Sequence, residues 1–273
     1  MADVEYGVGI GWRPEISGFV AELPGLRFAE VVAESVHAHG DLPAGLSELL
    51  ERGVTVIPHG VRLGLGGAEA VDPDRVRHLA TVAERVGAPL VSEHIAFVRA
   101  GGVEAGHLLP LPRSRDAVDA MVANVRRTQA ELAVPIALEP IAALFDWPDD
   151  ELSEADFITE ILDRTGAHLL LDIANVYANA RNRGTDPLEL LDKLPLDRIA
   201  YVHVAGGDEH DGLYHDTHTH ATPQPVLDLI TELCRRHRPP ALMLERDGDY
   251  PPAGELRSEL DAIAAASGYH PIT

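Results

Sequence analysis

The chain has 273 residues, of which 45% are apolar, enough for a substantial core in one large α/β barrel or two small domains. Its 44 acidic and 22 basic residues give a formal net charge of −22, which argues against nucleic acid or an anionic membrane as a partner. The single cysteine, Cys234, excludes an internal disulfide, a cysteine-based zinc site and an iron–sulfur cluster.

The N-terminal residues lack the basic region followed by a long apolar region that marks a signal peptide. No apolar run reaches the length that is needed to span a bilayer. We therefore expect a cytoplasmic protein without membrane association.

Eight short, almost continuously apolar runs alternate with longer amphipathic segments from one end of the chain to the other. Runs of this kind are typical of parallel strands that are covered on both faces. They are YGVGI (6–10), FAEVVA (28–33), VTVIP (54–58), PLVSE (89–93), PIALE (135–139), HLLLD (168–172), IAYVHV (199–204) and ALMLE (241–245). Eight βα units predict a (β/α)8 TIM barrel as a single domain over residues 1–273, and an open doubly wound sheet is the alternative.

Helical patterns fall between these runs. The clearest cover Pro73–Val86, Ser114–Leu132, Ser153–Arg164 and Pro223–Arg236. Predicted N-caps, whose hydroxyls can accept a hydrogen bond from the first helical turn, are Ser114, Ser153 and Thr222. Glycines stand where helices are expected to stop, at Gly53, Gly87 and Gly166. Loops are expected over Val61–Asp72, Phe97–His107 and Ala205–His220.

The stretch His203–His220, which reads HVAGGDEHDGLYHDTHTH, combines histidines with carboxylates. His203 lies at the end of a predicted strand, and the Gly- and Asp-rich residues after it indicate a loop. Neutral imidazole and carboxylate together are the usual ligands of zinc, iron and manganese. A solvated surface loop would account for any one of these histidines, but the cluster as a whole favours a metal site.

Seven of the predicted strands end in His, Glu or Asp. In chain order these residues are Glu34, His59, Glu93 with His94, Glu139, Asp172, His203 and Glu245. Active sites of (β/α)8 barrels lie at the C-terminal face of the strands, so we expect these side chains to meet. Buried carboxylates there would repel one another unless metal ions neutralised them.

Charge counting limits how many ions such a site can hold. Glu139, Asp172, Asp216 and Glu245 supply four negative charges, which balance two divalent ions. A third ion would need hydroxide, an anionic substrate group or an amide oxygen such as that of Asn175.

Three further residue roles follow from position in the chain. Asp216 and His218 are two residues apart and can point the same way in an extended loop. Glu93, next to a candidate ligand, is better placed to orient a histidine than to bind an ion. Glu139 lies between the strand 3–4 histidines and the strand 6–8 ligands, where its two oxygens can bridge two ions.

Motifs along nearly the whole chain resemble those of the multinuclear non-haem iron-dependent oxidative enzymes, formerly domain-of-unknown-function family 692. They are GVGIGWRPE (7–15), HG (59–60), VSEH (91–94), LLPLP (108–112), LEP (138–140), LLLDIANVY (169–177), HVAG (203–206), DTHTH (216–220) and LERD (244–247). The resemblance implies a xylose-isomerase-like TIM barrel with two or three irons. It implies an enzyme that uses O2 to modify a ribosomally made precursor peptide, often at cysteine, with help from a partner protein.

The family's metal ligands carry over to nine positions. These are His59, His94, Glu139, Asp172, Asn175, His203, Asp216, His218 and Glu245. We expect Glu139, Asp172 and His203 to be catalytic, with Glu34 and Glu93 orienting ligands. The chain departs from the family pattern at Pro140 and Ala174, where asparagine is expected, and in VAESVH, where a motif closer to HAEN is expected.

Other functions fit the same barrel. A sugar isomerase or epimerase would use Mn or Mg without O2 and would usually need a lysine near the metals, but no strand end carries one. A phosphodiesterase of the endonuclease IV kind conflicts with the acidic charge if DNA is the substrate. A metal store or sensor would not require so many ligands from separate strands.

Overall fold

A computed structural model describes residues 5–273 of the chain. Eight parallel strands form a closed barrel in the order β1-β12-β9-β8-β7-β4-β3-β2. Their bounds are β1 Gly7–Trp12, β2 Phe28–Val32, β3 Thr55–His59, β4 Val91–His94, β7 Ile136–Glu139, β8 His168–Asp172, β9 Ile199–Val204 and β12 Ala241–Leu244. Each predicted run overlaps one of these strands, so the barrel is confirmed and the open sheet is wrong.

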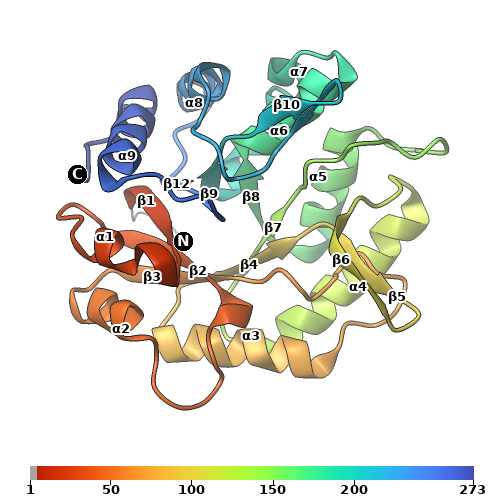
Figure 1. Cartoon of the computed structure of the whole chain (residues 1–273). Coiled ribbons are helices and arrows are strands. Elements are labelled where there is room, and N and C mark those ends of the chain that lie inside the picture. Colours follow the sequence, from red (N-terminus) through yellow and green to blue (C-terminus); the bar gives the residue numbers. More distant parts are fainter. Residues whose placement is uncertain (1–4) are drawn as a thin grey trace.

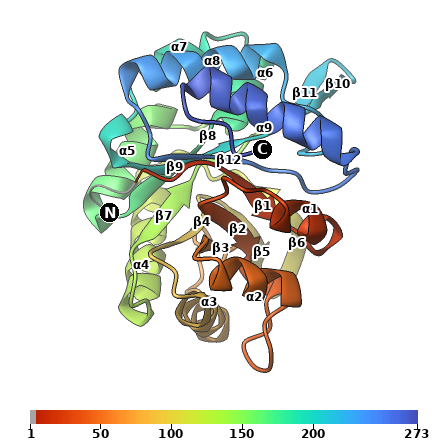
Figure 2. The same cartoon turned by 90° about the vertical axis from the view of Figure 1, so that its left-hand side faces the viewer.

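Helices surround the strands, as Figure 1 shows. They are α1 Ser17–Ala21, α2 Ala44–Glu51, α3 Pro73–Val86, α4 Arg115–Glu131, α5 Glu154–Thr165, α6 Ile173–Arg183, α7 Pro187–Leu191, α8 Gln224–Arg236 and α9 Ala253–Ser267. Short 3-10 turns are η1 Pro14–Ile16, η2 Ala33–Ser35 and η3 Leu196–Arg198. In Figure 2, α2 and α3 lie on one side of the barrel while α8 and α9 lie on the opposite side. Cys234 lies in α8, outside the barrel, as expected.

The four predicted helices are present with nearly the expected bounds. Ser114 and Ser153 cap α4 and α5, because their side chains accept hydrogen bonds from the backbone N–H groups of Ala117 and Asp156. Gly87 ends α3 in the left-handed conformation that glycine adopts without strain. The expected N-cap Thr222 is wrong: Pro223 holds that position in α8, and Thr222 N–H and Oγ1 both donate to a Glu259 carboxylate oxygen.

Two segments expected to be loops contain β-hairpins. Phe97–His107 holds β5 Phe97–Ala100 and most of β6 Val103–Leu109, and Ala205–His220 holds β10 Asp208–His210 and β11 Leu213–His215. Positive φ angles at Gly101 and Gly102, and at Asp211 and Gly212, give each hairpin a tight two-residue turn. The Gly-Gly and Asp-Gly pairs were the turn signals that the loop prediction did not use.

Side chains alternate along each strand, and this alternation layers the barrel interior. A buried apolar cluster fills the part of the interior that lies farther from the C-terminal ends of the strands, with Phe28, Ile57, Leu90, Leu170, Tyr201 and Met243 among its members. Two residues further along the same strands stand Glu30, His59, Ser92, Asp172, His203 and Glu245, all buried. The period of two therefore carries each strand from an apolar layer into a polar one at the C-terminal face.

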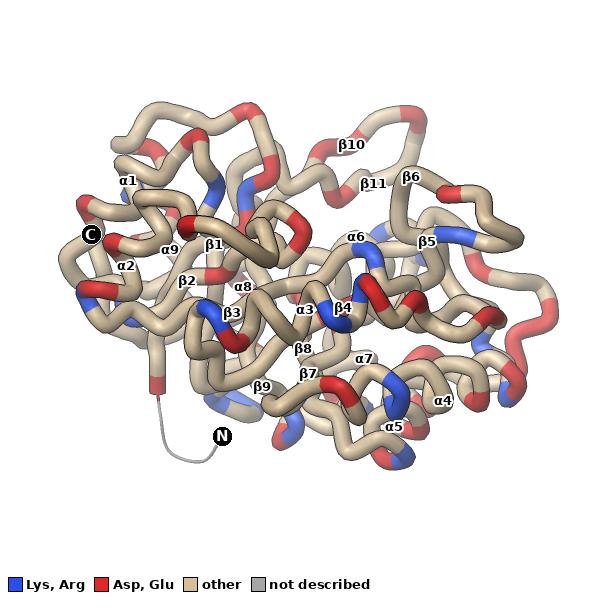
Figure 3. Tube along the Cα trace, turned by 90° about the horizontal axis from the view of Figure 1, so that it is seen from below, with Lys and Arg blue, Asp and Glu red and all other residues tan. Residues whose placement is uncertain are grey.

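Acidic and basic residues are distributed along the chain. Figure 3 shows Asp and Glu scattered along helices and loops, with Lys and Arg interspersed among them. Within residues 5–273, no helix is both long enough and apolar enough to cross a membrane.

Candidate metal centre

Six of the predicted ligands meet at the C-terminal end of the barrel, where each lies within one residue of the end of a strand. They are nearly inaccessible to solvent, with exposed fractions between 0% and 7%: His59, His94, Glu139, Asp172, His203 and Glu245. Asp216 and His218 join them from the loop after β11. The side chains form four overlapping groups in which the possible ligand atoms lie within 4.8 Å of one another.

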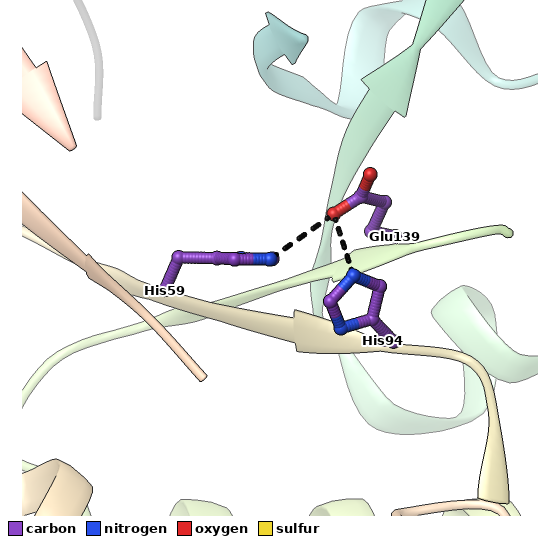
Figure 4. A group of neighbouring side chains, drawn as sticks. All are labelled: His59, His94 and Glu139. Atoms are coloured by element: carbon purple, nitrogen blue, oxygen red, sulfur yellow. Dashed lines mark ion pairs between the residues drawn. The ribbon is translucent and has the colours of Figure 1, made fainter. Parts of the chain in front are cut away.

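The first group consists of His59, His94 and Glu139, drawn in Figure 4. The Nε2 atoms of His59 and His94 lie 3.5 and 3.4 Å from the same Glu139 oxygen, Oε2. Two ligands that each lie about 2.1 Å from one ion are at most about 4.2 Å apart, so these spacings suit a single metal ion.

The second group consists of Glu139, Asp172, His203 and Glu245. His203 Nδ1 lies 2.8 Å from Glu245 Oε2 and 3.3 Å from Glu139 Oε1. The two oxygens of Glu139 therefore face two different groups, Oε2 toward the first and Oε1 toward the second. This is the arrangement of a carboxylate that can bridge two ions.

The third group consists of Asp172, Asp216 and His218. His218 Nε2 lies 2.7 Å from Asp216 Oδ2 and 3.8 Å from Asp172 Oδ2. Asp172 Oδ1 accepts hydrogen bonds from Ala174 N–H and Asn175 N–H and so caps α6. The helix thereby holds one oxygen of Asp172 in place while the other faces His218 of the third group, and Asp172 is also a member of the second group.

A fourth group joins His218 and Glu245 to Asp247, a residue that the sequence interpretation did not include among the ligands. Asp247 accepts two hydrogen bonds from the Arg13 guanidinium at 3.1 and 2.7 Å. Arg13 also lies 3.7 Å from Glu245. A fixed cation already neutralises this edge of the site, which makes it a weaker candidate for an ion than the first three groups.

Several buried atoms at this centre have no hydrogen-bond partner among residues 5–273. They are Glu139 Oε2, Asp172 Oδ2, His203 Nδ1, Asp216 Oδ1 and Glu245 Oε2. A buried polar atom without a partner costs about 1–3 kcal/mol, and more when it is charged. All five can donate a lone pair to a cation, so the residues present fit a multinuclear metal site.

Protons compensate the carboxylates when no cation is bound. Burial alone would lower the pKa of His94, but the charges of Glu139 and Glu93 raise it to about 9. Burial alone would raise the pKa of Glu139, but His203 and His94 lower it to about 2. Burial and the charge of Asp216 raise the pKa of Asp172 well above its usual range. A divalent ion would replace protons on the histidines.

The remaining predicted residues lie beside the groups. Asn175 Nδ2 donates to Pro140 O at 3.2 Å, so the opposite Oδ1 edge of this amide is the one that can face a cation. Glu93 Oε1 accepts from His94 N–H at 2.9 Å and lies 3.3 Å from His94 Nδ1, while Oε2 accepts from Leu63 N–H. Glu34 accepts from Val61 N–H and belongs to none of the groups.

Sequence reasoning missed the polar residues below the groups. Glu30 Oε2 lies 2.7 Å from His203 Nε2 and accepts from Tyr201 O–H at 2.6 Å. Burial raises the pKa of Tyr201 well above its usual range, so this phenol stays neutral and donates. Glu30 is a lone carboxylate inside the apolar run FAEVVA, two residues after the inward-facing Phe28. The spacing of two places Glu30 on the inward-facing side of the strand, and this could have identified it from the sequence.

Comparison with known proteins identifies the family of the chain. The family described as RiPP precursor modification enzyme MbnB/TglH/ChrH matches residues 7–267. The chain belongs to this family. The family resemblance drawn from the sequence motifs is therefore confirmed, and the family is one of enzymes.

Relatives across bacteria carry the name UPF0276 protein. One from Streptomyces avermitilis is 55% identical over 264 residues, which are 94% of this chain and 54% of the relative, so the chain spans about half of its length. One from Caulobacter vibrioides is 35% identical over 261 residues, which are 95% of this chain and 93% of the relative.

Solved structures with the same fold include D-psicose 3-epimerase from Clostridium cellulolyticum, with a TM-score of 0.63, 13% identity and coverage of 96% and 99% of the two chains. A xylose isomerase domain protein from Planctomyces limnophilus has a TM-score of 0.60, 15% identity and coverage of 97% and 98%. Endonuclease IV from Thermus thermophilus has a TM-score of 0.60, 15% identity and coverage of 95% and 98%. At these identities the likeness shows the xylose-isomerase-like barrel and nothing about the reaction.

Proposed function

We propose that this protein is a multinuclear non-haem iron enzyme that uses O2 to modify a ribosomally made precursor peptide, at a cysteine residue. The observation that carries the proposal is the placement of Glu139, whose two oxygens face two separate groups of histidines and carboxylates within a family of peptide-modifying enzymes. Two or three ions are expected. The mixed imidazole and carboxylate ligands suit iron, manganese or zinc better than magnesium or calcium.

Each ligand has a role that follows from its contacts. Glu139 would hold the first and second ions together, and Asp172 the second and third. His203 would complete the second position through Nδ1, with Asn175 Oδ1 available as a neutral ligand near Asp172. Bound iron would supply the one-electron redox chemistry through which O2 is used. The protein supplies the buried, water-poor surroundings and fixes the ligand positions.

The peptide is proposed to bind between two of the connecting segments at this end of the barrel. A cavity of 520 Å³ is lined by Val61 and Arg62 from the segment after β3 and by Val98, Glu104 and His107 from the β5–β6 hairpin. Val61 follows the candidate ligand His59 by two residues along the chain, although none of the described residues that line the cavity belongs to a metal group. A partner protein is proposed to help present the peptide, and the acidic charge of −22 makes a nucleic acid substrate unfavourable.

Metal identity and O2 use test the proposal directly. Protein that is expressed with iron and purified without oxygen is expected to hold at least two Fe per chain and to consume O2 when the precursor peptide is added. Metal analysis and an oxygen electrode measure these two quantities. Full activity with manganese or magnesium on a sugar, without O2, would instead identify an isomerase or epimerase. An active enzyme with stoichiometric zinc and no iron would contradict the iron assignment.

Substrate binding gives a second, spectroscopic prediction. Four carboxylates around two or three divalent ions leave room for one more anionic ligand, and a cysteine thiolate is a good ligand for iron. The chain's own thiol cannot serve, because Cys234 lies in α8 and burial raises its pKa to about 11. Adding the peptide to anaerobic iron-loaded protein is expected to produce a sulfur-to-iron charge-transfer absorption band.

The control for this experiment is a peptide in which the reacting cysteine is replaced by serine, which should give no band. Tight binding and normal turnover of the cysteine peptide without any band would contradict direct thiolate ligation. That outcome would leave the iron and O2 assignments standing.

A further inference from the structure

Below the metal centre, one continuous hydrogen-bond chain connects two histidines that belong to different metal groups. It runs from His59 Nδ1 to Ser92 Oγ at 2.8 Å, from Ser92 Oγ to Tyr201 OH at 2.7 Å, and from Tyr201 OH to Glu30 Oε2 at 2.6 Å. His203 Nε2 meets the same Glu30 oxygen at 2.7 Å. All five side chains are buried, with exposed fractions of 0% to 2%.

The carboxylate of Glu30, at which the hydrogen-bond chain ends, determines the direction of each hydrogen bond. The neutral phenol of Tyr201 donates to Glu30, so its oxygen accepts the hydroxyl hydrogen of Ser92. Ser92 has then used its one hydrogen, so its oxygen accepts from His59 Nδ1–H. His203 donates its Nε2–H to Glu30 directly. A single carboxylate oxygen therefore determines the hydrogen position on both histidines.

The opposite nitrogens face the metal groups. His59 Nε2 lies 3.5 Å from Glu139 Oε2 in the first group, and His203 Nδ1 lies 3.3 Å from Glu139 Oε1 in the second. The two histidines thus present different ring nitrogens to the centre, and each presents the nitrogen that the hydrogen-bond chain leaves without a hydrogen. An imidazole binds metal through a nitrogen that carries a lone pair, and a fixed tautomer raises its affinity.

We propose that Ser92, Tyr201 and Glu30 are positioning residues that preset the tautomers of His59 and His203, so that each histidine presents the correct ring nitrogen to its metal position. This inference deepens the proposed function and rests on its metal centre. The hydrogen-bond chain is branched at Glu30, so the two histidines depend on different residues. Loss of Tyr201 or Ser92 interrupts only the branch to His59, whereas a change at Glu30 affects both histidines.

The test uses zinc, which is diamagnetic, and full-length protein in which histidine is labelled with ¹⁵N. In wild type, NMR is expected to show His59 with its hydrogen on Nδ1 and zinc at Nε2, and His203 in the reverse arrangement, with signals assigned through His59→Gln. Tyr201→Phe and Ser92→Ala are each expected to lower zinc affinity at the His59 position at least about 10-fold. The His203 signals and the zinc affinity of the second position should stay as in wild type. Glu30→Gln should weaken both positions, because it removes the negative charge on which both branches end.

Tyr269→Phe is the matched control. Tyr269 donates its O–H to Pro239 O at the edge of the barrel and does not belong to any of the metal groups, so this variant loses one phenol hydrogen bond elsewhere. It should bind zinc as wild type does. Equal loss at both positions in Tyr201→Phe, or no loss at either, would overturn the inference while the wild-type zinc stoichiometry still supports the metal centre. Failure of wild type to bind zinc at these positions would overturn both.

Discussion

Glu139→Gln is expected to lose one metal ion and to lower activity by more than about 100-fold while the barrel stays folded. Removing residues that merely orient a ligand costs about 10–100-fold, and Glu139 is itself shared by two groups. An amide keeps one acceptor oxygen, which can serve one ion, but its NH2 group donates and cannot bind the second. Metal analysis, activity with the precursor peptide and far-ultraviolet circular dichroism measure the three quantities.

Two further variants sharpen this result. His59→Gln removes a ligand from the first group only, so it should lose one ion and leave the second group intact. Glu48→Gln makes the same chemical change on the exposed face of α2 and should change nothing. If Glu139→Gln retains the full metal content of wild type, Glu139 does not bridge two ions.

Much of this centre could be predicted from the sequence because the strands of the barrel repeat one pattern, an apolar run followed by a polar residue. Most of the strands are apolar runs with a polar, inward-facing residue at or near their C-terminal end, as in HLLLD ending at Asp172 and IAYVHV reaching His203. The C-terminal ends of parallel strands meet in a closed barrel, so residues at the strand ends become neighbours without any knowledge of long-range packing. Glu139 was placed between two sets of ligands for the same reason.

What could not be predicted depends on contacts across the barrel interior. Glu30 stands in the middle of β2, where it looks like an isolated exception, and its partner Tyr201 is 171 residues away in β9. Strands β2 and β9 are not neighbours in the sheet order, so no pairing rule brings the two residues together. Asp247 was missed because it lies after the strand end, where Arg13 from another part of the chain holds it.

The largest expected change in stability comes from a buried ion pair that supports the loop carrying Asp216 and His218. Arg246 donates from Nε and from one terminal nitrogen to Glu259 Oε2 at 3.2 and 2.8 Å, and from the other terminal nitrogen to Thr219 O at 2.7 Å. The two side chains are only 4% and 7% exposed. Glu259 Oε1 holds Thr222 at the start of the segment that leads into α8. The pair therefore connects β12, the 216–220 loop and α9.

Glu259→Ala is expected to lower the free energy of unfolding by about 3–5 kcal/mol, because it leaves the buried Arg246 cation without its partner. For a chain of this size that corresponds to a fall in Tm of roughly 10 °C. The double variant Arg246→Met/Glu259→Leu should recover part of this loss, since replacing both charges removes the cost of a buried unpaired ion. Because only the double variant removes the hydrogen bond from Arg246 to Thr219 O, metal affinity at the Asp172–Asp216–His218 group should be lower in the double variant than in wild type, even as Tm recovers. Calorimetry and metal titration together check this prediction, and wild-type metal affinity in the double variant would show that Arg246 does not position the loop.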